Sequence, residues 1–65
     1  MEAVKNHHYL HKKGGVYQVI LFAEHSETKE DMVVYRRLSD NKVYVRPREM
    51  FEDGRFQPTD ENGRP

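Results

Sequence analysis

The chain gathers its most reactive side chains in residues 24–31, EHSETKED. His25, Ser26 and Glu27 are the residue types of a nucleophilic triad, but they are consecutive in the sequence. Consecutive side chains on an extended backbone point to opposite faces, so the three cannot form one proton relay. No Gly-x-Ser-x-Gly motif presents Ser26 as a nucleophile. We therefore predict no catalytic residues here and do not expect an enzyme.

The same segment is rich in carboxylates, which are ligands for hard divalent cations. Their spacing matches no calcium loop, and the central glycine of such a loop is missing. The Ser and Thr hydroxyls instead favour a structured turn, and Thr28 with Asp31 resembles a capping box. His25 stays a candidate ligand-binding residue, because a histidine at a strand end can titrate near neutrality.

Three further histidines, His7, His8 and His11, raise the possibility of a zinc site. His7 and His11 share one face of either a helix or a strand, so two ligands can converge. Zinc needs at least a third protein ligand, and the sequence forces none to lie near these two. We therefore expect a solvated N-terminal segment, no metal site and no cofactor.

Length and composition limit the class of protein. The chain has 65 residues, 11 Lys and Arg, 11 Asp and Glu, and no cysteine. It is expected to form one domain without disulfides. General nucleic-acid binders usually carry a surplus of positive charge, so general nucleic-acid binding is not expected and any anion site must be local. No apolar run approaches the ~20 residues of a membrane-spanning helix, and a cytoplasmic location is expected.

Hydrophobic periodicity predicts strands at residues 16–24, 32–38 and 43–46. A short helical turn is expected over residues 47–54, between Pro47 and Gly54, and a last short strand passes through Phe56. The predicted fold is all-β, a small, strongly bent antiparallel sheet forming an SH3-like barrel with one short helical turn. The ordered core of this single domain, residues 1–65, is expected over about 8–57, with residues 1–6 and 58–65 flexible.

The turn SDNK at residues 39–42 sets the pairing of the strands on either side of it. Centring it between residues 40 and 41 pairs Tyr35 with Arg46 and Arg37 with Tyr44. These four residues, which we call the Tyr/Arg face, then lie on one side of the hairpin. The other side carries four apolar residues, Val34, Leu38, Val43 and Val45. We expect the valine side to point to the core and the Tyr/Arg face to point to solvent.

The Tyr/Arg face has a structural and a functional interpretation. Arginine over tyrosine is a cross-strand cation–π pair, giving ~0.5–1 kcal/mol when exposed, and it requires no ligand. Alternatively, tyrosine rings stack on planar groups, and arginine binds phosphate or carboxylate through two parallel hydrogen bonds. Four basic residues of this half, Arg36, Arg37, Arg46 and Arg48, are Arg rather than Lys, which favours bidentate recognition.

Four motifs carry a resemblance to a known family: HSET at 25–28, VVYR at 33–36, VRPxEMF at 45–51 and RF at 55–56. Together they make the chain similar, over about residues 8 to 57, to a group of small bacterial and phage proteins, the domain of unknown function family 1653. That family usually has tryptophan at the position of Tyr44. The resemblance implies a compact SH3-like β domain and no assigned activity.

The leading functional prediction is a small noncatalytic binding module. It would recognise a nucleotide-like, phosphorylated or carboxylated partner through Tyr35, Arg37, Tyr44 and Arg46, with His25 at the rim. The alternative is a structural or protein–protein interaction domain, such as a homodimer, without a small-molecule ligand. Ile20 and Phe22, expected on the outer side of the longest strand, motivate that alternative.

Overall fold

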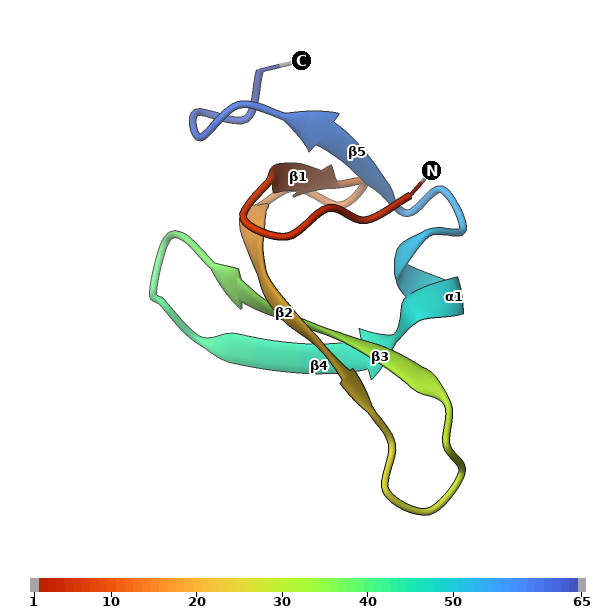
Figure 1. Ribbon diagram of the computed structural model, residues 1–65. Helices are drawn as coiled ribbons and strands as arrows, with labels where there is room; N and C mark the ends of the chain where they lie inside the picture. The colour runs from red at the N-terminus through yellow and green to blue at the C-terminus, as the bar shows by residue number, and fades with distance from the viewer. Residues whose placement is uncertain (1, 65) are drawn as a thin grey trace.

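A computed structural model describes residues 2–64 of the protein, which fold into one five-stranded antiparallel sheet and one short helix (Figure 1). The elements, in chain order, are β1 (His8–His11), β2 (Val16–Glu24), β3 (Asp31–Arg37), β4 (Val43–Pro47), α1 (Arg48–Phe51) and β5 (Phe56–Thr59). The all-β prediction with one helical turn is confirmed. Strand β1, predicted as a solvated segment, was missed. Within residues 2–64, no helix has the length and apolar character needed to cross a membrane.

The sheet has the order β4-β3-β2-β1-β5, so β4 and β5 are its two edge strands. Among the described residues these edges do not pair with each other, and the predicted closure into a barrel is therefore wrong. The sheet is nevertheless strongly bent, because the long strand β2 runs from β1 at one end of the molecule to β3 at the other (Figure 1). Helix α1 contacts β3 and β4 and lies at the open side of the bend.

Strand β2 contains a β-bulge at Ile20. Val19 pairs with Tyr35 and Leu21 pairs with Val34, so Ile20 has no partner in the β2–β3 ladder. An unpaired residue reverses the faces of all following side chains. The alternation expected from Tyr17 to Ala23 is consequently interrupted.

The bulge moves Phe22 to the inner side of the bend, where it pairs with buried Val33. The guanidinium carbon of Arg48 lies 4.6 Å from the centre of the Phe22 ring. The expectation that Phe22 lies on the outer side was therefore wrong. Leu21, expected on the same side as Tyr17 and Val19, lies on the outer side and is 42% exposed.

Aromatic rings fill the inside of the bend. Phe51 from α1 and Phe56 from β5 stack with centroids 4.2 Å apart, and the edge of Tyr9 meets Phe51 at 5.3 Å. Full burial of each such side chain stabilises the folded state by roughly 1.5–3 kcal/mol. The buried residues of the core are Ala3, Tyr9, Val19, Val33, Tyr35, Phe51 and Phe56.

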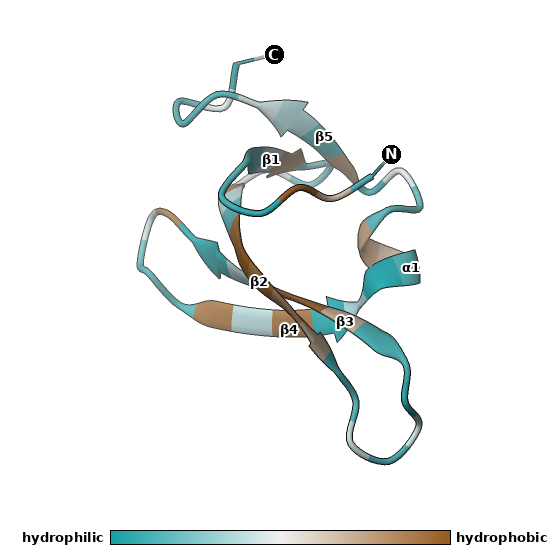
Figure 2. Cartoon of the chain, viewed as in Figure 1, coloured by the Kyte–Doolittle hydropathy of each residue, from teal (hydrophilic) through white to brown (hydrophobic). Residues whose placement is uncertain are grey.

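The inner and outer faces of the β3–β4 hairpin are the reverse of the prediction. Tyr35 is only 3% exposed, whereas Val43 and Val45 are each 57% exposed. In Figure 2 a pale segment separates the brown segments of β4, as the sequence VYVRP of this strand requires. Rings from β1, α1 and β5 all pack inside the bend, and the large ring of Tyr35 completes that cluster better than a valine would.

Two residues of the segment before β1, Ala3 and Val4, form hydrogen bonds with the rest of the domain. The Ala3 amide donates to Glu52 Oε2 at 2.6 Å, and the Val4 amide donates to the Tyr9 hydroxyl at 2.8 Å. The buried Ala3 side chain belongs to the core.

Candidate functional site

The Tyr/Arg face depends on the register of the β3–β4 hairpin. Tyr35 pairs directly with Tyr44, and Val33 pairs with Arg46, a shift of two residues from the predicted alignment. Leu38 leaves the strand and joins the turn, where Asn41 takes a left-handed conformation at φ 59°. Because a shift of two preserves the side of every residue, the four residues still share one face.

Direct contacts connect the members of this face. The Tyr35 and Tyr44 rings stack with centroids 5.8 Å apart and planes inclined by 26°. The guanidinium carbon of Arg37 lies 5.4 Å from the Tyr44 ring centre, and that of Arg46 lies 5.7 Å from the Tyr35 ring centre. The predicted arginine–tyrosine cation–π pairs are present, although they are diagonal rather than directly opposite.

The four residues line a pocket of about 230 Å³ inside the bend, which we call the aromatic pocket. Its lining residues are His11, Tyr17, Tyr35, Arg37, Tyr44, Arg46 and Phe56. Sequence reasoning did not assign His11, Tyr17 or Phe56 to this site. The strand pairing places them there: His11 pairs with Phe56, and Tyr17 pairs with Arg37.

Arg46 is the most unusual cation of the pocket. Its Nε donates to the Tyr35 hydroxyl at 2.8 Å, and its guanidinium carbon lies 5.2 Å from the Phe56 ring centre. Its Nη1 is buried and has no hydrogen-bond partner among the described residues. No carboxylate in residues 2–64 forms an ion pair with it. A buried donor without a partner is energetically costly, and an anion in the pocket would remove that cost.

Arg37, in contrast, is neutralised within the hairpin. Its Nε and Nη2 donate to the two carboxylate oxygens of Asp40, at 3.1 and 2.8 Å. These hydrogen bonds raise the pKa of Arg37 further above its usual value and lower the pKa of Asp40 to about 2. Arg37 therefore contributes less unbalanced charge to the pocket than Arg46 does.

A second hollow of about 380 Å³ adjoins the aromatic pocket, and we call it the basic hollow. It is lined by His11, Lys12, Lys13, Arg46 and Arg55. Burial lowers the pKa of His11, and the positive charges of Arg46, Lys13, Lys12 and Arg55 lower it further. The local potential is thus positive although the net charge of the chain is zero.

His25 does not join the Tyr/Arg face. It lies in the β2–β3 connection, and it is not among the lining residues of the aromatic pocket. Its Nδ1 accepts hydrogen bonds from the amides of Glu27 at 3.2 Å and Thr28 at 3.3 Å. The Thr28 hydroxyl in turn accepts from the Glu30 amide at 3.3 Å. Here the histidine and the hydroxyl organise the turn, in place of the predicted capping box.

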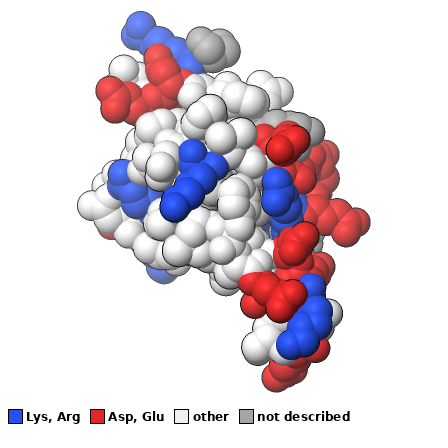
Figure 3. Space-filling model, viewed as in Figure 1, with Lys and Arg blue, Asp and Glu red and all other residues white. Residues whose placement is uncertain are grey.

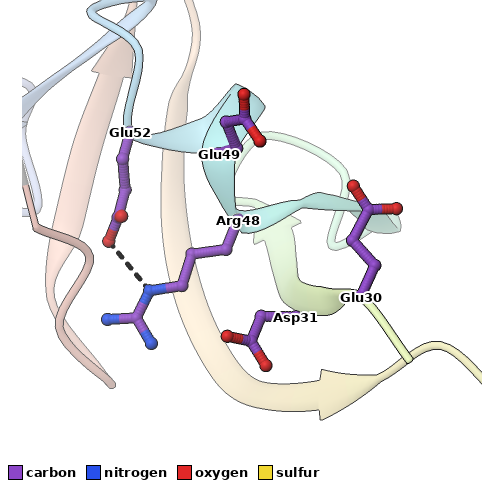
Figure 4. A pocket seen from close by; sticks show the side chains of 5 residues that line it. All are labelled: Glu30, Asp31, Arg48, Glu49 and Glu52. Atoms are coloured by element: carbon purple, nitrogen blue, oxygen red, sulfur yellow. Dashed lines mark hydrogen bonds and ion pairs between the residues drawn. The ribbon is translucent and has the colours of Figure 1, made fainter. Parts of the chain in front are cut away.

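A third hollow, of about 370 Å³, lies between α1 and the start of β3 (Figure 4). Four carboxylates and one arginine line it: Glu30, Asp31, Arg48, Glu49 and Glu52. Arg48 Nε donates to Glu52 Oε2 at 3.0 Å, so its charge is used within the site. Among residues 2–64 no group of histidine, cysteine or acidic side chains is arranged to hold a metal ion. This acidic hollow is a poor site for anions.

Acidic side chains gather along the side of the molecule that carries the β2–β3 hairpin and α1 (Figure 3). The basic hollow is formed instead by the β1–β2 turn, β4 and the residue before β5. The acidic side of the molecule and the basic hollow are therefore built from different segments. A local positive site is thus present although the net charge of the chain is zero.

Comparisons with known proteins identify a family but no activity. No curated protein matches the chain. No solved structure matches it either. A family described as "Protein of unknown function (DUF1653)" matches residues 7–58, which are most of the chain. The resemblance found in the sequence motifs is thereby confirmed, and the chain belongs to this family of proteins of unknown function.

Proposed function

We propose that this domain is a noncatalytic binding module for a small ligand that joins a planar group to a negative charge. The single observation that carries the proposal is Arg46, which lines the aromatic pocket with a buried, unpartnered Nη1 and no carboxylate partner among the described residues. A nucleotide-like, phosphorylated or carboxylated ligand supplies the acceptor that this guanidinium lacks.

The tyrosines have different parts in this proposal. Tyr35 is buried, so its ring is not accessible for stacking, and its hydroxyl positions the Arg46 guanidinium. Tyr17 and Tyr44 are half-buried and line the same pocket. Their accessible surfaces are suited to stack on a planar group, an interaction worth about 1–3 kcal/mol for a nucleic-acid base.

The lining of the aromatic pocket supports binding rather than catalysis. It contains one histidine, three tyrosines, two arginines and one phenylalanine, and no serine, threonine or carboxylate. The serine, threonine and carboxylate nucleophiles that many enzymes use are therefore absent from the lining. His25 and Ser26, the reactive types of the β2–β3 connection, are not part of it.

The proposal is tested by titrating ¹⁵N-labelled protein with nucleosides, nucleoside monophosphates and aromatic carboxylates. We expect resonances of Arg37, Tyr44 and Arg46 to shift, and R46Q to weaken binding by about tenfold or more. R36Q is the matched control, because Arg36 lies on the opposite face of the same hairpin and donates to Gln18. A spectrum that stays unchanged at millimolar concentrations of every ligand would refute the proposed function.

A second candidate function, self-association, is favoured by the outer face of the sheet. Leu21, Val34 and Val45 form one cross-strand row over β2, β3 and β4. Leu21 and Val45 are 42% and 57% exposed, and β4 is an edge strand. A second copy covering this row would enlarge the small core of the domain. Light scattering should then show a dimer that V45E abolishes, whereas a monomer at millimolar concentration excludes it.

A further inference from the structure

We infer that the charged part of the ligand is a phosphate group and that it binds in the basic hollow, at Lys12, Lys13, Arg46 and Arg55. This inference rests on the proposed function, since the planar part of the same ligand occupies the aromatic pocket. It adds a phosphate subsite formed by the β1–β2 turn and by the residue before β5.

The two cavities are continuous in their lining. Both include His11 and Arg46, so a ligand that fills both passes these two side chains. The Arg46 guanidinium carbon lies 5.7 Å from the Tyr35 ring centre and 5.2 Å from that of Phe56. This one cation therefore lies at the border between a ring-lined site and a site lined by positive charge.

The number of cations favours phosphate over a carboxylate. Arg46, Lys12 and Lys13 form no ion pair with any carboxylate in residues 2–64, while Arg55 Nε lies 3.0 Å from Asp53 Oδ2. A carboxylate carries one negative charge, whereas a terminal phosphate carries between one and two near neutral pH and has three acceptor oxygens. Three unneutralised cations around one hollow match the higher charge.

Hydrogen bonds of the backbone amides order the turn that carries Lys12 and Lys13. The Lys12 amide donates to the Arg55 carbonyl at 2.8 Å, which ties the turn to the segment before β5. The Lys13 amide donates to His11 Nδ1 at 3.1 Å, and Gly14 and Gly15 close the turn at φ 98° and 90°. Side chains on an ordered turn lose less entropy on binding than those on a loose one.

His11 supplies a second, independent readout of the same event. Arg46, Lys12, Lys13 and Arg55 are the charged groups around it, and all are positive. A bound phosphate would offset their field, so the pKa of His11 should rise on binding. Binding at His11 then takes up a proton, and this contribution to affinity grows as the pH falls. Protonation of the phosphate itself, whose second pKa is about 6, acts in the opposite direction, so the His11 resonance rather than the overall affinity reports the event.

The distribution of charge favours a small molecule over a polymer. The chain has equal numbers of acidic and basic residues. Carboxylates line the side of the β2–β3 hairpin and α1 (Figure 3). A nucleic-acid strand needs a continuous basic track for its successive phosphates, whereas this domain offers one basic hollow.

The test compares a purine nucleoside, its 5′-monophosphate, its 5′-triphosphate, an aromatic carboxylate and a 12-nucleotide single strand by calorimetry and NMR. We expect the phosphates to tighten binding about tenfold or more relative to the nucleoside. The double variant K12Q/K13Q should remove most of this gain without changing the affinity for the nucleoside. R55Q should remove a smaller part of it, because Arg55 is already paired with Asp53. K5Q/K29Q, which removes two exposed lysines outside the lining of both cavities, should keep the gain.

The possible outcomes separate this inference from the proposed function. Equal affinity for nucleoside and nucleotides, or binding of the aromatic carboxylate alone, overturns the phosphate subsite and leaves the binding module standing. Tighter binding of the single strand than of the triphosphate overturns the assignment to a small molecule. A His11 resonance whose titration midpoint stays fixed when the 5′-monophosphate binds contradicts the subsite as well. Failure of every ligand to bind removes both proposals.

Discussion

Arg46 on β4 donates its Nε hydrogen to the hydroxyl of Tyr35 on β3, at 2.8 Å, inside the bend of the sheet. Tyr35 belongs to the buried core, whereas Arg46 lines both the aromatic pocket and the basic hollow. One hydrogen bond thus connects the packing of the domain with its candidate binding site. Changes to the core at this position should alter the orientation of the cation on which the proposed function depends.

The substitution Y35F tests this connection. It removes the hydroxyl that accepts the hydrogen bond from Arg46 Nε. The Arg46 guanidinium already has a buried Nη1 without a partner, so in Y35F two of its donors would lack one. We expect the free energy of unfolding to fall by about 1–2 kcal/mol, measured by urea denaturation. Y44F is the control, because no described residue forms a hydrogen bond with the Tyr44 hydroxyl, and its effect should stay below about 0.5 kcal/mol. Equal losses in the two variants would contradict this role of Tyr35.

Phe51 should be indispensable for folding. Its side chain is 0% exposed and stacks on Phe56. Truncation to alanine in F51A costs roughly 3–5 kcal/mol, a large part of the total stability of so small a domain. We expect a largely unfolded protein by circular dichroism at 25 °C. The neighbouring variant M50A removes a side chain of a residue that is 40% exposed and should remain folded.

The Arg37–Asp40 ion pair should make stability depend on acid pH. The pKa of Asp40 is about 2 in the folded protein, below its usual value of 3.8, chiefly because of the hydrogen bond from Arg37. The stabilisation is complete above about pH 4 and is lost as the pH falls through about 2. D40N should flatten this part of a stability–pH curve measured by urea denaturation. Since the pair is exposed, added salt should reduce the difference in stability between the wild-type protein and D40N. E61Q, which removes a carboxylate that forms none of the ion pairs of the described residues, is the control.

Glu52 should anchor the N-terminal segment. Burial alone would raise its pKa, but hydrogen bonds from the Ala3 amide and Arg48 outweigh that effect, and the pKa is lowered. The anchor should therefore be present above pH 4.5 and weaken as the pH falls through the lowered pKa. We expect E52Q to destabilise the domain by about 1 kcal/mol and to speed hydrogen exchange at the Ala3 amide. Unchanged exchange at Ala3, matching that of the control E49Q, would contradict the anchor.

Local sequence signals predicted most of the fold. The hydrophobic pattern of residues 16–24 predicted β2 with its observed ends. Pro47 and Gly54 flank the helical turn as expected, with φ angles of −55° and 106°. The barrel was not predictable in the same way, because closure depends on whether edge strands β4 and β5 meet, and no local pattern encodes that distance. Strand β1 was missed because its four residues, HYLH, carry only a short and weakly apolar pattern.

The sequence predicted that the four residues of the Tyr/Arg face lie together, but not that they point into the bend of the sheet. The four residues of the Tyr/Arg face share one side because the error in register was two residues, an even number. Their inward direction was missed because β3 is half apolar on both sides, with Val33 and Tyr35 on one and Met32 and Val34 on the other. Rings from distant segments decide between these sides, and a single hairpin gives no information about them.

The bulge at Ile20 has a further consequence for β2. Since Ile20 is surplus to the ladder, a chain one residue shorter at this point would retain the orientation of both Val19 and Phe22. Deletion of Ile20 should therefore leave the pairing of β2 with β3 intact.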